Sequence, residues 1–149
     1  MVAKSARRLM MDSMKAKART VRNGRYFVKR GAIDWTSHDF ASKPFALSLQ
    51  IDDGSLLRTA SVRGMKSARI SMEMFAPLPK AQDVPEIDDG LLDELIDDAE
   101  AIVLDLVTAR DSSDDPIVFR VDETGARFVE AHDISLLVQG IVVTFNVQY

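Results

Sequence analysis

Two histidine–aspartate pairs come closest in residue type to a catalytic site, His38-Asp39 and His132-Asp133. A histidine beside a carboxylate can act as a general base or bind a metal ion. Both pairs lie in segments of loop composition, and neither shows a metal-binding spacing such as HxH or HExxH. The pattern therefore predicts neither catalysis nor metal binding at these histidines.

A run of acidic residues is the second candidate site, consisting of Asp93, Glu94, Asp97, Asp98 and Glu100. Carboxylates can hold a divalent cation, but this run lacks the DxDxDG arrangement of a calcium-binding loop. On a regular helix such a run is typical of a solvated face. The sequence also has no cysteine and no GxxxxGK[ST] or GxGxxG motif for binding phosphate. We therefore expect no catalytic residue, no metal site and no cofactor, and we do not expect an enzyme.

Charge is strongly segregated along the chain, although the net charge of its 149 residues is only −4. Residues 1–30 hold ten bases and one acid, and residues 83–115 hold thirteen acids and one base. Opposite charges on this scale favour contact between the two segments, either within the chain or between subunits. Six basic residues are the candidates for contacts with a partner or a neighbouring subunit: Arg58, Arg63 and Lys66, and Arg7, Arg8 and Lys15.

Length and composition indicate one soluble domain. The 46% content of hydrophobic residues is sufficient for a core. The basic N-terminus lacks the apolar segment of a secretory signal, and no apolar run approaches the roughly 20 residues that span a bilayer. We expect a single domain over residues 1–149, with a basic helix and extension at 1–42 and a sheet-helix core at 43–149.

The final segment, residues 138–149, has the clearest strand pattern. Residues on one side are apolar, and the other side carries Gly140, Val142, Thr144, Asn146 and Gln148, with no charge or proline. The apolar side consists of Ile141, Val143, Phe145, Val147 and Tyr149. This alternation predicts a half-buried β-strand whose apolar side packs on the core.

Two amphipathic helices are predicted, from Ala3 to about Arg22 and from Asp88 or Asp89 to about Arg110. In the first, apolar residues recur at helical spacing at Ala6, Leu9, Met10, Met14, Ala18 and Val21, and Asn23-Gly24 is expected to end the helix. In the second, they recur at Leu91, Leu92, Leu95, Ile96, Ala99, Ile102, Val103, Leu106 and Val107. We expect the second helix to cover the sheet with this stripe.

Further strands are predicted at 26–33, 44–52 and 68–76, and at 117–121 with a turn at 122–125 and a return over 126–131. The strands at 44–52 and 68–76 form a hairpin, and residues 55–66 either extend it or form a basic loop. Trp35 and Phe40 are expected to anchor the loop at 34–43. Three prolines exclude a helix or central strand at 77–85 and indicate a crossover. The fold class is therefore α+β, a mostly antiparallel sheet packed by an amphipathic helix, with an additional N-terminal helix.

Four segments carry a resemblance to a known family. They are Lys43 to Leu49 (KPFALSL), Ser67 to Pro77 (SARISMEMFAP), the helix from Gly90 to Val103, and Ser135 to Tyr149, which ends in V-x-Y. In this order they resemble the tail terminator family of long-tailed bacteriophages, of the lambda minor tail protein U type. The likeness covers roughly residues 43–149 and is one of element order and pattern.

The resemblance implies a structural virion protein at the head-proximal end of a phage tail, assembled in the host cytoplasm. It would form a homo-hexameric ring that caps the tail tube and provides a surface for head-tail joining. Its partners would be its own copies, the tail tube protein and a neck or head-completion protein, with DNA able to pass through the ring lumen and no membrane involved. The main alternative is a neck, head-closure or baseplate adaptor ring. A nucleic-acid-binding regulator, suggested by the basic helix, is less favoured.

Overall fold

The computed structural model describes residues 5–35, 37–52, 67–77, 88–118, 120–132 and 137–149. The elements follow in the order α1 (Ala6–Thr20), the 3-10 helix η1 (Val21–Gly24), β1 (Phe27–Arg30), β2 (Ala46–Asp52), β3 (Ser67–Pro77), α2 (Asp89–Thr108), β4 (Arg120–His132) and β5 (Leu137–Gln148). The predicted hairpin tip at 55–66 lies outside the described residues, as does the predicted crossover beyond Pro77.

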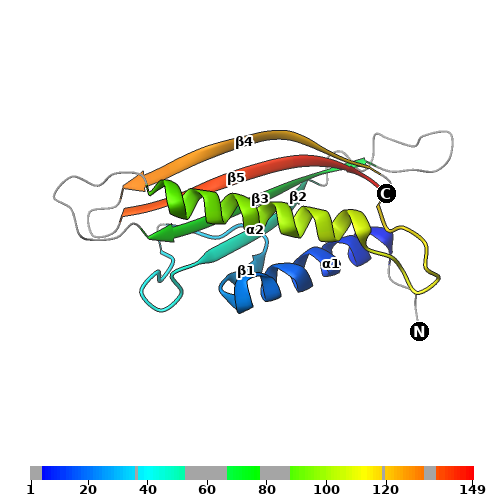
Figure 1. Ribbon diagram of the computed structural model, residues 1–149, viewed down its shortest axis with the longest axis horizontal. Helices are drawn as coiled ribbons and strands as arrows, with labels where there is room; N and C mark the ends of the chain where they lie inside the picture. Colours follow the sequence, from blue (N-terminus) through cyan, green and yellow to red (C-terminus); the bar gives the residue numbers. More distant parts are fainter. Residues whose placement is uncertain (1–4, 36, 53–66, 78–87, 119, 133–136) are drawn as a thin grey trace.

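The five strands form one sheet in the order β1-β2-β3-β5-β4. The β1–β2 pair is parallel, and the other three pairs are antiparallel. Figure 1 shows both helices on the same face of the sheet, with α1 on the side of β1 and α2 running along β3 and β5. The predicted α+β class, with a mostly antiparallel sheet, a covering helix and an additional N-terminal helix, is confirmed.

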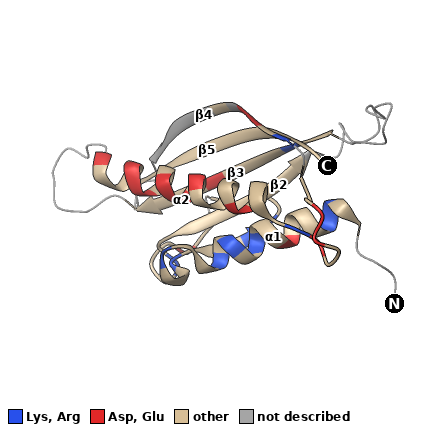
Figure 2. Ribbon diagram, turned by 45° about the vertical axis from the view of Figure 1, so that its right-hand side comes forward, with Lys and Arg blue, Asp and Glu red and all other residues tan. Residues whose placement is uncertain are grey.

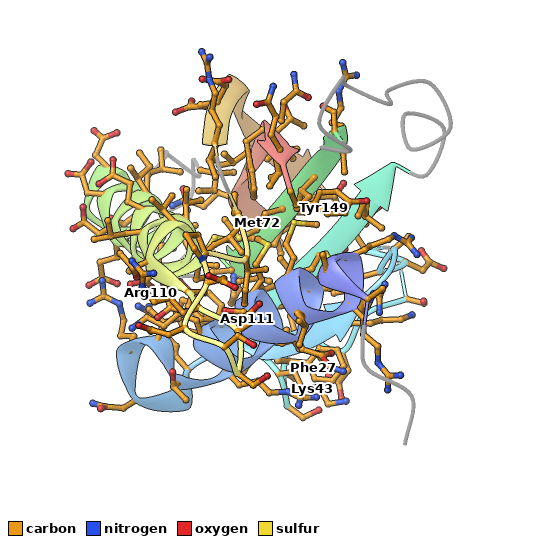
Figure 3. The ribbon with its side chains drawn as sticks, turned by 90° about the vertical axis from the view of Figure 1, so that its right-hand side faces the viewer. Phe27, Lys43, Met72, Arg110, Asp111 and Tyr149 are labelled. Atoms are coloured by element: carbon orange, nitrogen blue, oxygen red, sulfur yellow. The ribbon has the colours of Figure 1, made fainter. Side chains whose placement is uncertain are left out.

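The core lies between this face of the sheet and the two helices. Strand register aligns apolar residues in rows across the sheet, such as Leu47 opposite Met74 and Met74 opposite Ile141. All three side chains are at most 2% exposed, so the helices cover this row. Met72 and Tyr149 also lie in this layer (Figure 3). The predicted facing of the C-terminal strand is therefore confirmed.

The opposite face of the sheet is also covered where β5 begins. Phe75 and Val138 are buried there under Phe40 and Trp35, which belong to the loop between β1 and β2. The indole N–H of Trp35 donates to the carboxylate of Glu73 on β3, at 2.7 Å. Both anchors predicted for this loop are confirmed. The first half of β5 is consequently buried on both sides, and the predicted half-buried pattern holds only for its second half.

Helix α1 begins at a side-chain cap, where the Arg8 N–H donates to Ser5 Oγ at 3.2 Å. The predicted stripe is largely correct, but Met11 is also buried, and Ala6 is exposed. The helix ends near the predicted Asn23-Gly24, where three successive residues from Arg22 onward have positive φ. Left-handed backbone cannot continue a right-handed helix, so the chain turns towards β1.

Helix α2 begins at Asp88, whose side chain accepts from the Leu91 N–H at 3.1 Å. The buried amide of Gln139 on β5 pairs with both backbone groups of Asp88, each at 2.9 Å. This contact fixes the start of α2 over the end of the sheet. The predicted stripe is too wide at its C-terminal end, because Val107 is 48% exposed.

The prediction of a short strand, a turn and a return over residues 117–131 is wrong. Residues 120–132 form one long strand, β4, whose register against β5 shifts between Glu123 and Gly125. Such a shift is a β-bulge, which accommodates an extra residue without ending the strand. Glycine is typical of both turns and bulges, so the local pattern alone did not separate them.

Candidate functional site

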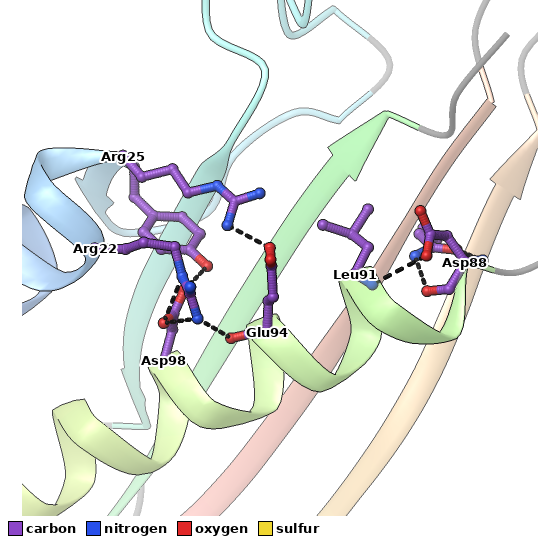
Figure 4. A network of polar contacts seen from close by, with 8 residues as sticks. Arg22, Arg25, Asp88, Leu91, Glu94 and Asp98 are labelled. Carbon is purple, nitrogen blue, oxygen red and sulfur yellow. Dashed lines mark hydrogen bonds and ion pairs between the residues drawn. The ribbon is translucent and has the colours of Figure 1, made fainter.

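The acidic helix α2 and the basic segment after α1 meet in a polar network (Figure 4). Arg22 has a positive φ of 49° and lies in the turn that ends α1. From there Arg22 Nε donates to both carboxylate oxygens of Asp98, at 3.0 and 2.9 Å. Asp98 is only 4% exposed, so its expected place on a solvated face is wrong. A buried carboxylate needs such partners because desolvation penalises its charge.

Tyr26 completes the environment of Asp98. Its hydroxyl donates to the same carboxylate, and the tyrosine is itself buried. Burial, followed by the bond to Asp98, raises the pKa of the Tyr26 phenol well above its ordinary value. The phenol therefore remains a hydrogen-bond donor at neutral pH, and this cluster serves to join elements of the fold.

A second ion pair lies one turn of α2 earlier. Arg25 NH1 contacts Glu94 Oε2 at 2.7 Å, and the Arg25 guanidinium lies 3.4 Å from the centre of the Phe45 ring. Together with the Arg22 contact, this pair shows that oppositely charged segments meet within the chain. The alternatives left open by the sequence are thus partly resolved, since Arg22 and Arg25 of the basic N-terminal segment contact acids of α2.

The predicted interface residues on α1 have different exposures. Arg8 is exposed, whereas Arg7 and Lys15 are half-buried. Figure 2 shows basic residues along α1 and acidic residues along α2, the neighbouring helix. The other predicted interface residues, Arg58, Arg63 and Lys66, lie outside the described residues.

His38 belongs to an aromatic cluster. Its Nε2 lies 3.0 Å from the backbone oxygen of Lys43, and its ring packs edge-on against Phe40, with 4.5 Å between ring centres. The adjacent Asp39 accepts from Ser42, and these bonds lower the pKa of the Asp39 carboxyl. The Lys43 ammonium lies 4.2 Å from the centre of the Phe27 ring, and Figure 3 shows the two side by side. These contacts explain how His38 and Asp39 anchor the loop between β1 and β2.

The second histidine pair begins at the end of β4. The side chain of His132 and all of Asp133 lie outside the part of the chain that the structure describes. Among the described residues, no group of three or more histidine or acidic side chains is arranged to hold a metal ion. The acidic residues that remain exposed along α2 include Asp93, Asp97 and Glu100.

An apolar groove of about 640 Å³ lies between α2 and the strands β4 and β5. It is the surface feature that sequence reasoning missed. Its walls come from Ile96, Asp97, Ala99, Glu100, Ala101, Val103, Leu104, Val107, Val121, Glu123, Val143 and Phe145. The signal was present in the width of the apolar stripe on α2, which exceeds what one contact with a sheet can bury.

A scan against models of known protein families matches none of them, and a search of curated proteins finds no significant match. In the described part of the chain, no helix has both the length and the apolar character needed to cross a membrane.

Proposed function

We propose that this protein is a ring-forming structural protein of a bacteriophage tail, a tail terminator that caps the tail tube. The order of elements supports the proposal. From β2 onward, an antiparallel strand pair, an amphipathic helix and a closing strand follow one another, in the order that the resemblance implies for residues 43–149. In this role the ring limits the length of the tube and offers its other side for joining to the head.

The observation that carries the proposal is the position of the two kinds of surface on one domain. The acidic, apolar groove lies beside α2 and β4, whereas the basic helix α1 lies towards β1, at the other edge of the sheet. A ring is built from heterologous contacts, in which one patch meets a different patch on the next subunit. A domain with two unlike surfaces on opposite sides is suited to that symmetry.

The first test is the mass of the purified protein in solution, measured by sedimentation or native mass spectrometry. A hexamer is expected, and a monomer at all concentrations and salt levels contradicts the proposal. The second test is binding to tubes assembled from the neighbouring tail tube protein. A ring that binds a neck or baseplate protein but not the end of the tube identifies an adaptor instead.

Charge-reversal variants then separate the basic segments. Arg7→Glu/Arg8→Glu and Arg58→Glu/Arg63→Glu are compared with the parent across a salt series. Electrostatic contacts weaken with salt, because the screening length falls to about 3 Å at 1 M. A matched control, Lys29→Glu/Arg30→Glu, reverses the same charge on the exposed end of β1. If both test variants assemble and bind tubes like the parent at low salt, these basic segments do not form the contact.

A gel-retardation experiment tests the regulator alternative. If the parent retards DNA fragments at physiological salt and the Arg7→Glu/Arg8→Glu variant does not, nucleic-acid binding replaces the ring as the function of the basic helix. The tail terminator proposal expects weak retardation that salt abolishes, because one basic helix offers few phosphate contacts.

A further inference from the structure

The groove beside α2 exposes apolar groups that a folded domain normally covers. Leu104 is 65% exposed and Val107 is 48% exposed, and they are the two large hydrophobic side chains most open to solvent in the described part of the chain. The groove is also lined by Val143 of β5, which is half-buried, and by Phe145, which is 1% exposed and adds little area of its own. Contiguous exposed apolar surface of this kind marks a contact with another molecule.

Acidic groups surround this apolar floor. The carboxylates of Asp97, Glu100 and Glu123 belong to the groove wall, and its lining within the described residues includes no basic side chain. All three are exposed. The complementary partner must therefore present basic groups together with an apolar surface.

Helix α1 presents such a surface. Arg8, Lys15 and Arg19 are seven and four positions apart, a spacing that places them on one side of the helix, with Asp12 between them. Arg8 and Arg19 are exposed, and Lys15 is half-buried. The methylene stems of arginine and lysine can cover apolar surface while their charged ends reach carboxylates at a rim. We call the three bases the α1 stripe.

The α1 stripe and the groove cannot meet within one chain. In the sheet order β1-β2-β3-β5-β4, α1 lies at the β1 end and the groove lies at the β4 end, with α2 between them (Figure 1). A second copy of the chain can bring its own α1 stripe to the groove. Because the two surfaces differ, this contact is heterologous and repeats from copy to copy.

We propose that the groove between α2 and β4 receives the α1 stripe of a second copy of this chain, and that this is the contact between neighbouring subunits. The inference rests on the proposed ring and names the residues that close it. Opposite charge guides the approach and sets the register, and the apolar floor supplies the buried area.

The test uses two charge-reversed variants, Arg8→Glu/Arg19→Glu on the stripe and Asp97→Lys/Glu100→Lys on the groove rim. Each alone should assemble at least tenfold more weakly than the parent in sedimentation at low salt. An equal mixture of the two should recover assembly as alternating rings. In such a ring each reversed stripe meets a reversed groove, and each unchanged stripe meets an unchanged groove. A single chain that carries all four changes should recover it as well.

The apolar part of the contact is tested by Leu104→Asp, with Thr108→Asp as a control. Both positions are exposed on α2, so the fold should persist, which thermal unfolding followed by circular dichroism checks. Leu104→Asp should weaken assembly at least tenfold, and Thr108→Asp should weaken it much less, because Thr108 does not line the groove.

The outcomes separate this inference from the proposed function. If the parent forms rings and the groove variants form them equally well, the groove is not the contact, and the ring proposal stands. If groove variants keep their rings but lose the tube, the groove binds the tube protein and the inference is wrong. If the two reversed variants fail to recover assembly together, the stripe and groove are not partners. If the parent never assembles, both the ring proposal and this inference are wrong.

Discussion

The guanidinium of Arg22 and the carboxylate of Asp98 are joined by two hydrogen bonds of 3.0 and 2.9 Å, although the residues are 76 positions apart. Arg22 lies just beyond α1, in a left-handed turn, and Asp98 lies in the middle of α2. The contact therefore joins the basic and acidic segments of one chain. It also fixes how α1 is placed beside α2, and so where the outer surface of each helix points.

Replacing Asp98 by alanine should lower the free energy of unfolding by about 1–3 kcal/mol, the usual cost of leaving a buried polar group unpaired. The group left without its acceptor is the buried hydroxyl of Tyr26. Urea unfolding followed by circular dichroism measures the change. Asp97→Ala is the matched control, because Asp97 is exposed on the same helix and should change stability by at most about 0.5 kcal/mol. Equal losses in both variants contradict a structural role for Asp98.

Tyr26 should make the stability of the fold fall at alkaline pH. In the unfolded chain a tyrosine releases its proton near pH 10, whereas burial and the bond to Asp98 raise the pKa of Tyr26 in the folded chain. Below pH 10 both states hold the proton, and the contribution of the phenol is complete. Above pH 10 only the unfolded state releases it, so stability falls by up to about 1.4 kcal/mol per pH unit.

The Tyr26→Phe variant isolates this effect. The free energy of unfolding of parent and variant is measured between pH 8 and pH 11. The advantage of the parent should be constant up to about pH 10 and then decrease. A difference between parent and variant that does not change across this range would show that the phenol titrates alike in both states.

Regular alternation made the sheet predictable. The final strand and the helix after Asp88 follow their periods over many residues, and both were located and oriented correctly. The long strand β4 was not, because Gly125 sits at a bulge within the strand. The hydrophobic period and the turn-forming residues are local properties of the sequence. The pairing with β5 that keeps β4 a continuous strand is a long-range property.

The candidate surfaces were harder to predict for the same reason. Asp98 was placed with its acidic neighbours, because the sequence does not record that Arg22 and Tyr26 approach it from a distant segment. The groove depends on how far α2 leaves the β4 edge uncovered, which the tertiary packing decides. Helix α1 was correctly identified as basic. Tertiary packing, which the sequence does not record, places the α1 stripe at the opposite edge of the sheet from the groove.

Replacing Phe145 by alanine should destabilise the protein by about 3–5 kcal/mol, the usual cost of emptying a large aromatic site in a packed core. The side chain is 1% exposed and faces the helices. Gln148→Ala, three residues later on the opposite face and half-buried, should cost far less. Denaturant unfolding of the two variants measures the difference, and similar losses would show that the faces of β5 are wrongly assigned.

Gly140 is the position in β5 where a side chain should be least tolerated. A Cβ atom there would lie 2.1 Å from the backbone oxygen of Met74 and 2.8 Å from the Phe75 ring. The first contact is with the backbone of the neighbouring strand, which cannot move without breaking the β3–β5 pairing. Gly140→Ala should therefore cost at least the ~1–3 kcal/mol typical of overpacking.

Gly125→Ala provides the control within the same sheet. At Gly125 the nearest atom to a new Cβ is Thr144 Oγ1 at 3.5 Å, an ordinary contact distance. Thermal unfolding of both variants tests the comparison, with the Gly140 variant expected to melt at a much lower temperature or to remain unfolded. If Gly140→Ala melts with the parent while Gly125→Ala does not, β3 and β5 do not approach each other at Gly140 as closely as the structure requires.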